Sequence, residues 1–350
     1  MRKSRKHDPP RLIRNNPQPK GLILDTITRE TMSKTIVITG ASSGAGRAIA
    51  LAFAENKEKL VLASRNIGEL ETVAAECESL GAKVQCIQAD VTDPGAMINV
   101  AALADDFGSG VDVWVNNAGV LAAGAFDETP IVVLDQVIKT NLMGYIHGAH
   151  AILPYFKKRK KGILINNISI GGFLPVPNGV GYSASKFGLR GFSAALKAEL
   201  TGFPEIHVCD IFPAFLDTPG IQHAANYTGK SIKPAPPVYD PARVAQAVVR
   251  LAAQPRSETM IGSLSYLVRA SYALFPGITR TLAGEVINGY LKQAEAIEKT
   301  DGNIFETVPF GNAVYGGWGI PGKPKAHRKY LVSGLLFIAA AGLLTTLRKR

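Results

Sequence analysis

Tyr182 and Lys186 place a phenol and an ammonium four residues apart, near the expected start of a helix. Residues i and i+4 share one face of a helix, so the two groups are expected side by side. A free phenol has a pKa of about 10 and is a weak acid–base catalyst at neutral pH, but a neighbouring ammonium stabilises the phenolate. The alternative is an ordinary helix that carries a Tyr and a Lys without chemistry.

Ser169 follows the apolar run 162–168 and precedes Tyr182 by thirteen residues. In α/β proteins ligands bind beyond the carboxyl ends of parallel strands, which is where Ser169 is expected. Its hydroxyl can hydrogen-bond a substrate oxygen while Tyr182 moves the proton, so both side chains are candidate substrate-binding groups. The arrangement suits hydride transfer to or from a carbonyl carbon.

A glycine-rich turn follows the first apolar run of the chain. Its glycines, Gly40, Gly44 and Gly46, let the backbone turn tightly and approach a pyrophosphate closely. Ser42 and Ser43 add hydroxyl donors. The spacing G-x-x-x-G-x-G differs from the G-x-G-x-x-G of many dinucleotide-binding folds. A strand before the turn and a helix after it favour a cofactor site over glycines that serve only steric needs.

The second expected strand, residues 59–63, ends in Ser64, Arg65 and Asn66. In dinucleotide sites an acid at this point suits a free ribose 2′-hydroxyl, whereas an Arg suits a 2′-phosphate. No acid occurs before Glu69, and Arg65 can hydrogen-bond a phosphate, with Ser64 and Asn66 as further donors. The sequence therefore favours NADP(H) over NAD(H); the alternative is a solvated Arg that begins a loop.

The elements that must position these groups alternate along the chain. Short apolar, β-branched runs predict strands at 35–39, 59–63, 83–89, 111–115, 162–168, 206–212 and 257–264. Longer amphipathic or Ala-rich segments predict helices at 45–57, 67–80, 94–107, 131–156, 183–202 and 240–253. Such alternation is typical of βαβ units, so we expect an α/β fold with a parallel sheet covered on both faces.

Charge and cysteine content exclude some classes of protein. The net charge of +11 is concentrated in residues 1–34, at +6, and residues 323–350, at +7, which leaves −2 for the body between them. A nucleic-acid-binding protein carries its positive charge on the folded face that docks, so no nucleic-acid partner is expected. The three cysteines, at positions 77, 86 and 209, show neither disulfide nor metal-ligand spacing, which indicates a reducing compartment and no metal site.

The two ends of the chain differ from the body. Residues 1–33 are basic and lack sustained apolar periodicity, so they are expected to be a disordered extension. Met32 is the expected natural start, the alternative being a genuine basic arm from Met1. Residues 330–347 are uncharged and would span roughly 27 Å as a helix, which predicts a membrane anchor with the folded body on the cytoplasmic side. A buried or dimer-packing helix is the alternative.

Six motifs occur in the order found in one enzyme family: TGASSGAG at 39–46, NNAG at 116–119, Asn141 in KTNLMG, Ser169, YSASK at 182–186 and PAFLDT at 213–218. Residues 35–265 thereby resemble the short-chain dehydrogenase/reductase family. The resemblance implies a Rossmann-like, doubly wound sheet of seven parallel strands. It also implies a catalytic tetrad of Asn141, Ser169, Tyr182 and Lys186, in which Lys186 contacts the nicotinamide ribose and Asn141 holds a water in a proton relay.

The resemblance assigns further cofactor contacts to Asp90, Val91, Asn117, Ala118, Gly119, Pro213 and Thr218. Together with the composition of the two ends, it divides the chain into the extension 1–33, a catalytic domain 34–265, a C-terminal extension 266–329 that covers the substrate or lies against a membrane, and the apolar segment 330–347. The expected function is NADP(H)-dependent interconversion of a lipophilic ketone or aldehyde and its alcohol at a membrane. The alternative is a membrane-bound NADP(H) sensor or scaffold without turnover. A homodimer and a homotetramer both remain open.

Overall fold

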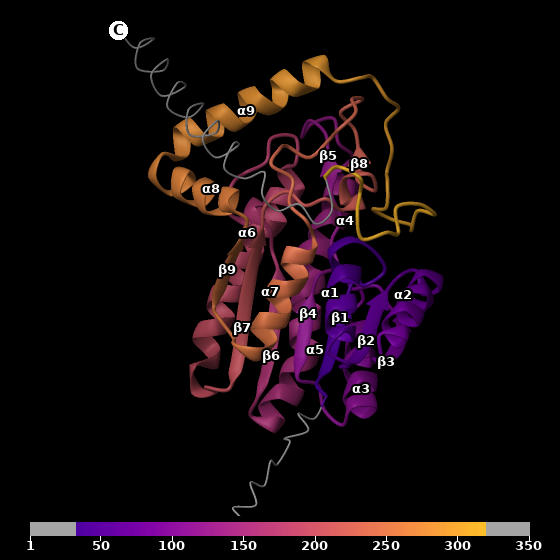
Figure 1. Cartoon of the computed structure of the whole chain (residues 1–350). Helices are drawn as coiled ribbons and strands as arrows, with labels where there is room; N and C mark the ends of the chain where they lie inside the picture. The colour runs from indigo at the N-terminus through magenta and orange to yellow at the C-terminus, as the bar shows by residue number, and fades with distance from the viewer. Residues whose placement is uncertain (1–32, 320–350) are drawn as a thin grey trace, which may run out of the picture. The chain divides into compact units, whose positions relative to one another are not determined.

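A computed structural model describes residues 33–319 and contains the expected seven-stranded parallel sheet (Figure 1). The strands are β1 (Thr35–Thr39), β2 (Lys59–Ser64), β3 (Lys83–Gln88), β4 (Val113–Asn116), β6 (Gly162–Asn167), β7 (Ile206–Pro213) and β9 (Glu258–Ile261). They pair in the order β3-β2-β1-β4-β6-β7-β9. This doubly wound, Rossmann-like order confirms the predicted fold class. The order reverses between β1 and β4, which is where such sheets bind ligands.

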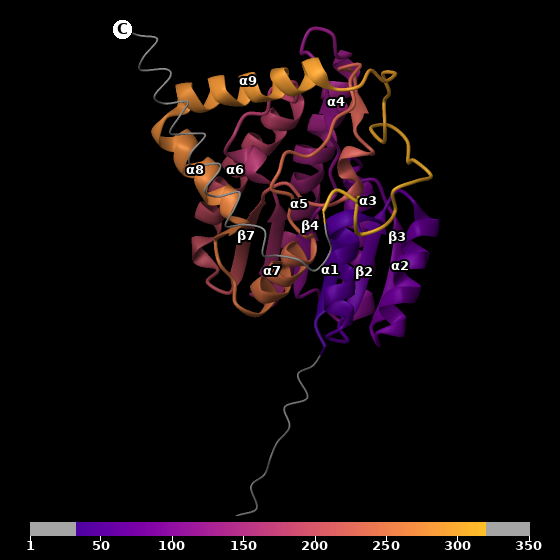
Figure 2. The ribbon, with the colours of Figure 1, turned by 45° about the horizontal axis from the view of Figure 1, so that its top comes forward.

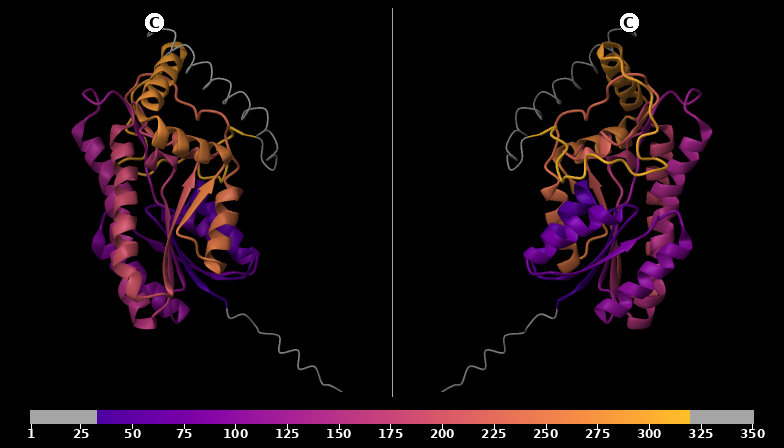
Figure 3. Two further views of the ribbon diagram at one scale, coloured as in Figure 1. Left: turned by 90° about the vertical axis from the view of Figure 1, so that its left-hand side faces the viewer. Right: turned by 90° about the vertical axis from the view of Figure 1, so that its right-hand side faces the viewer.

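Helices cover both faces of this sheet, as Figure 3 shows from the side. One face carries α1 (Gly44–Ala54), α2 (Ile67–Ser79) and α7 (Ala242–Ala253); the other carries α3 (Pro94–Gly108), α5 (Gly144–Arg159) and α6 (Val180–Glu199). Successive side chains of β1 point to opposite faces of the sheet. Ile36 and Ile38 therefore pack into the core under α1, whereas Val37 packs into the core under α3 and α5. Both faces are therefore apolar, which explains the nearly continuous apolar strands.

The helix expected over 131–156 is interrupted. It consists of α4 (Ile131–Ile138), a π-helical turn (Lys139–Met143) and α5, which ends at Arg159 rather than at residue 156. The buried residues of the turn are polar, Thr140 and Asn141, so apolar periodicity did not mark the interruption. Single π-turns inside helices occur frequently at functional sites, and this one carries Asn141.

Two helices extend the chain beyond the last strand. They are α8 (Ser263–Leu274) and α9 (Pro276–Gln293), and none of the residues of α9 is buried. Figure 1 shows both helices at the end of the sheet that also carries the small parallel pair β5 (Ala122–Ala123) and β8 (Ala225–Asn226). Figure 2 shows α9 lying across this end of the molecule. After α9 the chain returns toward the sheet as an irregular segment, residues 300–319, which we call the strap.

We expected residues 330–347 to form a membrane anchor, and these residues lie outside the described part of the chain. Residues 1–32 of the expected N-terminal extension lie outside it as well. Among residues 33–319 no helix is long and apolar enough to span a bilayer.

Candidate active site

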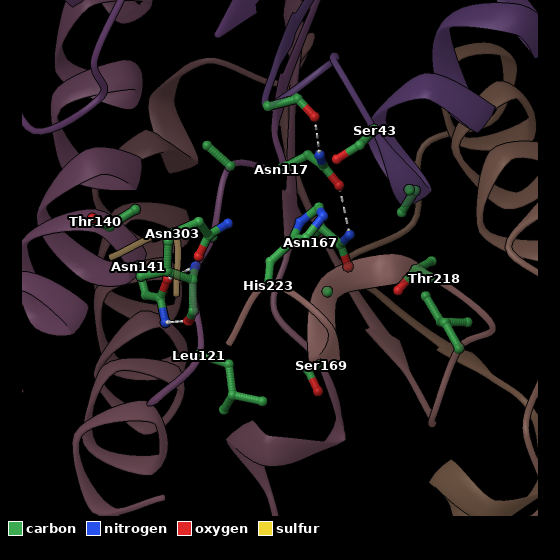
Figure 4. Close-up of a pocket in the computed structure, with 18 of the residues that line it drawn as sticks. Ser43, Asn117, Leu121, Thr140, Asn141, Asn167, Ser169, Thr218, His223 and Asn303 are labelled. Atoms are coloured by element: carbon green, nitrogen blue, oxygen red, sulfur yellow. Dashed lines mark hydrogen bonds between the residues drawn. The ribbon is translucent and has the colours of Figure 1, made fainter. Parts of the chain in front are cut away.

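A cavity of about 440 Å³ opens at the carboxyl ends of the strands (Figure 4). Segments that follow β1, β2, β3, β4, β6 and β7 all contribute to its wall. The predicted site residues that line it are Gly40, Ser42, Ser43, Gly44, Ser64, Arg65, Asn66, Asp90, Val91, Asn117, Ala118, Gly119, Asn141, Ser169, Tyr182, Lys186, Pro213 and Thr218. The fold thus brings together residues that lie up to 178 positions apart, as Gly40 and Thr218 do.

Gly46 is the predicted cofactor residue that is not among those lining the cavity. A Cβ at this position would lie 2.0 Å from the carbonyl oxygen of Gly40 and 2.7 Å from Asn117 Nδ2. Gly46 therefore permits α1 to pack closely against the end of β1, and its role is steric. Gly40 has a φ of +65°, which is the left-handed conformation that the tight turn requires.

Asn117 connects the ends of three strands. Its Nδ2 donates to the carbonyl oxygens of Thr39 and Gly40, both at 3.1 Å, and its Oδ1 accepts from Asn167 Nδ2 at 2.9 Å. Figure 4 shows this side chain between the glycine-rich turn and the end of β6. The side chain therefore fixes the cavity wall on the side of the glycine turn, a role that the sequence alone did not specify.

Ser169 and Tyr182 are neighbours across Gly171. A Cβ on Gly171 would lie 2.7 Å from Tyr182 Cε1 and 3.6 Å from Ser169 Oγ. Ser169 has a φ of +100°, an unusual value for a non-glycine residue, and such strain is concentrated at functional sites. Burial raises the pKa of Tyr182, and a hydrogen bond with the Ser169 side chain opposes that shift. At neutral pH Tyr182 therefore keeps its phenolic proton.

Lys186 lies on the same face of α6 as Tyr182. Its Nζ is 5.7 Å from the centroid of the Tyr182 ring, 5.1 Å from that of Tyr145, and 3.3 Å from the carbonyl oxygen of Asn167. Burial lowers the pKa of Lys186 to about 7. The expectation that its ammonium would lower the pKa of Tyr182 is not met, because desolvation dominates the shifts of both groups.

Asn141 holds the start of α6 in place from the π-helical turn. Its amide pairs with the backbone of Val120, since Oδ1 accepts from the N–H and Nδ2 donates to the C=O, both at 2.8 Å. Nδ2 also donates to Ser185 Oγ at 3.3 Å, and Ser185 Oγ donates to the carbonyl oxygen of Tyr182 at 2.7 Å. Asn141 thus links the β4 loop to the turn of α6 that carries Tyr182.

Arg65 lines the cavity as predicted, but its guanidinium points at the strap. Nη1 donates to the carbonyl oxygens of Ile304 at 3.3 Å and Phe305 at 3.1 Å, and Nη2 donates to that of Asn303 at 2.7 Å. Asn66 caps α2 by accepting the Glu69 N–H, so its Oδ1 is already engaged.

Sequence reasoning missed several residues of the wall. His223 lies in the cavity and is only 6% exposed; its Nε2 is 2.8 Å from the carbonyl oxygen of Phe310. Burial lowers the pKa of His223. The strap contributes four further lining residues, Asn303, Thr307, Val308 and Asn312. No local motif marks these positions. Asn303 and Asn312 accept hydrogen bonds from Arg65 and Arg47, which precede them by 238 and 265 positions.

The donors in this wall fit a dinucleotide. Hydroxyls of Ser42, Ser43 and Thr218, the N-terminus of α1 and the cations of Arg65 and Lys186 all face one cavity. Such groups bind phosphate and ribose oxygens. The remaining wall is largely apolar and includes Leu121, Ile170, Leu174, Val176, Phe215, Leu216 and Ile221.

Comparison with known proteins supports the same assignment. The family model described as short chain dehydrogenase matches residues 34–227. An uncharacterized oxidoreductase of Bacillus subtilis, YxnA, is 31% identical over 264 residues, which are 74% of each chain. The 3-ketodihydrosphingosine reductase of Bos taurus is 28% identical over 257 residues, 71% of this chain and 77% of the relative.

A solved structure resembles the fold as well. The alcohol dehydrogenase of the archaeon Thermococcus sibiricus, complexed with 5-hydroxy-NADP, has a TM-score of 0.58 and 27% identity, and the match covers 67% of this chain and 97% of that chain. Motifs, sheet order and family match agree. The chain belongs to the short-chain dehydrogenase family and is an NAD(P)-dependent oxidoreductase.

Proposed function

We propose that this protein reduces a lipophilic ketone or aldehyde to its alcohol with NADPH, at a membrane, using Tyr182 as the general acid. The observation that carries the proposal is the meeting of Ser169, Tyr182 and Lys186 in one cavity with the glycine-rich turn. The catalytic role of each side chain follows from its position and its protonation state.

Tyr182 and Ser169 act on the substrate oxygen. NADPH, when bound, supplies the hydride that adds to the carbonyl carbon. Ser169 Oγ donates a hydrogen bond to the carbonyl oxygen, and Tyr182 transfers its phenolic proton to that oxygen, which completes the alcohol. The raised pKa of Tyr182 keeps it protonated at neutral pH, which is the form that can donate this proton.

Lys186 and Asn141 support this proton transfer. With a pKa of about 7, Lys186 exists in both protonation states near neutrality and can return a proton to Tyr182. Asn141 acts as a positioning residue, because it holds Val120 and Ser185 and thereby the first turns of α6. Its place in a water-mediated relay remains the expectation from the family resemblance.

The apolar wall supports a lipophilic substrate. Leu174, Val176, Phe215 and Ile221 offer aliphatic and aromatic surface in the same cavity as Ser169. The similarity to a 3-ketodihydrosphingosine reductase points to the same substrate class, a ketone with apolar chains. Membrane attachment through residues 330–347 would bring the cavity to the lipid phase where such substrates reside.

The cofactor choice rests on Arg65 and on the similarity to a dehydrogenase solved with an NADP derivative. Arg65 stands after β2, where a cation suits a 2′-phosphate. We expect NADPH to bind more tightly than NADH. A preference for NADH in titrations of the wild type would contradict the role of Arg65.

The decisive test is NADPH oxidation with a panel of hydrophobic ketones, comparing wild type with Tyr182→Phe. Loss of the proton donor should lower kcat by roughly 10²- to 10⁴-fold. Tyr155→Phe is the control, because Tyr155 is packed against the core under α3 and α5. Equal, measurable rates for wild type and Tyr182→Phe would refute catalysis by Tyr182, whereas NADPH binding without oxidation by either protein would favour a non-catalytic sensor. For the anchor, deletion of residues 330–350 should release the protein from the membrane fraction.

A further inference from the structure

The strap crosses the part of the cavity where cofactor phosphates are expected. Figure 1 shows it in yellow, after α9. It begins with a backbone pair between Thr300 and Asn226 in β8, with N–O distances of 2.7 and 3.0 Å. It ends with the backbone N–H groups of Trp318 and Gly319 donating to the Asp217 carboxylate at 2.7 and 2.9 Å. Between these anchors, strap residues line the cavity.

Strap carbonyls accept hydrogen bonds from three donors, of which Arg65 and Gly44 line the cavity, whereas Arg47 is also ion-paired with Glu76. Arg65 donates to the three consecutive carbonyls of residues 303–305. The Gly44 N–H, at the N-terminus of α1, donates to the Ala313 carbonyl oxygen at 3.0 Å. Arg47 Nη1 donates to the Asn312 carbonyl oxygen at 2.7 Å. The strap thus presents partial negative charge to groups suited to bind anions.

The strap is shaped for this docked position. Gly311 has a φ of +70°, and a Cβ there would lie 2.2 Å from His223 Nε2. Gly302 has a φ of +54°, and a Cβ there would lie 2.2 Å from the His223 carbonyl oxygen. Side chains are therefore excluded at both positions by backbone conformation and by space. Glycine here permits a close fit against the loop that carries Thr218 and His223 in the cavity wall.

We propose that the strap is a latch released by the 2′-phosphate of NADP(H), and this inference rests on the proposed function. A phosphate dianion forms stronger hydrogen bonds with a guanidinium than neutral carbonyls do, so it displaces residues 303–305 from Arg65. A neutral ribose 2′-hydroxyl lacks that charge and leaves the strap docked. Release loosens the hold of the strap on Asp217 and His223, which couples the loop that carries them to the cofactor.

Hydrogen exchange on the full-length wild type tests the latch with a matched pair of nucleotides. 2′,5′-ADP and 5′-AMP differ only in the 2′-phosphate, and each is added to the same fractional occupancy. We expect 2′,5′-ADP to raise deuterium uptake in peptides covering residues 300–313, and 5′-AMP to leave it unchanged. Reduced uptake with 2′,5′-ADP would show that the strap closes over the nucleotide, and would overturn the latch. An equal response to both nucleotides would overturn it too.

A variant provides an independent measurement. Gly311→Ala should undock the strap and lower the Kd for 2′,5′-ADP about fivefold or more, since binding no longer requires release of the latch. The control is Gly289→Ala in α9, because no atom of residues 33–319 lies within 4 Å of a Cβ built there and its φ is not positive. Gly289→Ala should keep the wild-type Kd.

The outcomes separate the two proposals. An unchanged or higher Kd in Gly311→Ala, with a wild type that binds 2′,5′-ADP, would refute the latch and leave the NADPH-dependent reductase intact. A wild type that binds neither NADPH nor 2′,5′-ADP would refute the proposed function, and the latch with it.

Discussion

Burial of Lys186 should make the stability of the cofactor-free protein depend on pH. The pKa of this ammonium falls from 10.5 to about 7 on folding, because the folded chain removes it from water. Between these two values the unfolded chain binds a proton at Lys186 that the folded chain does not. Stability therefore rises with pH across this window, by up to about 1.4 kcal/mol per pH unit.

Lys186→Met tests this reasoning, since Met fills similar space without a charge. Urea unfolding of both proteins at pH 7.5, 8.5 and 9.5, at fixed ionic strength, gives the difference in unfolding free energy at each pH. Over these two units the wild type should gain roughly 2 to 3 kcal/mol relative to the variant. Lys292→Met, which removes an exposed ammonium on α9, controls for the loss of one positive charge.

Parallel pH dependences for wild type and Lys186→Met would refute the argument. They would mean that Lys186 keeps its proton in the folded chain up to the pH at which the unfolded chain loses it. Lys186 would then be fully protonated near neutral pH. It would not exist in the two protonation states that the proposed return of a proton to Tyr182 uses.

Two further changes address the framework of the site. Asp210→Ala should lower the unfolding free energy by roughly 3 kcal/mol, because it leaves Lys197 and Ser193, each 2.6 Å from the Asp210 carboxylate, without that partner; a loss below about 1 kcal/mol in urea unfolding would contradict this. Gly46→Ala should abolish nucleotide binding in calorimetry, since its Cβ would lie 2.0 Å from a backbone oxygen. The control, Gly191→Ala on the exposed side of α6, should leave nucleotide binding unchanged and raise the unfolding free energy by about 1 kcal/mol. If both substitutions changed nucleotide binding equally, the steric role of Gly46 would be refuted.

Local pattern was enough to predict the sheet and to name candidate catalytic residues that the fold brings into one cavity. Strands of β-branched residues and amphipathic helices are encoded within windows of about ten residues, so all seven sheet strands were predicted within a few residues of their bounds. The i, i+4 spacing of Tyr182 and Lys186 is sufficient to place both side chains on one face of a helix. The rule that ligands bind at the carboxyl edge then placed Ser169 near them.

Other features depend on long-range packing and carry no local signal. The protonation of Lys186 and Tyr182 is set by desolvation, which depends on all the elements that surround them. The role of Gly46 depends on the distance between α1 and the end of β1.

The sequence by itself thus determined the family and the parallel sheet and named the candidate reacting side chains, because these follow from short-range periodicity and motif order. Only the tertiary structure decided that Arg65 faces the carbonyls of residues 303–305, some 240 positions along the chain. No window of sequence encodes such a contact, since it depends on how α8, α9 and the strap return to the cavity. The hydrogen-bond partners of Arg65 are therefore supplied by a chain segment that lacks any recognisable motif.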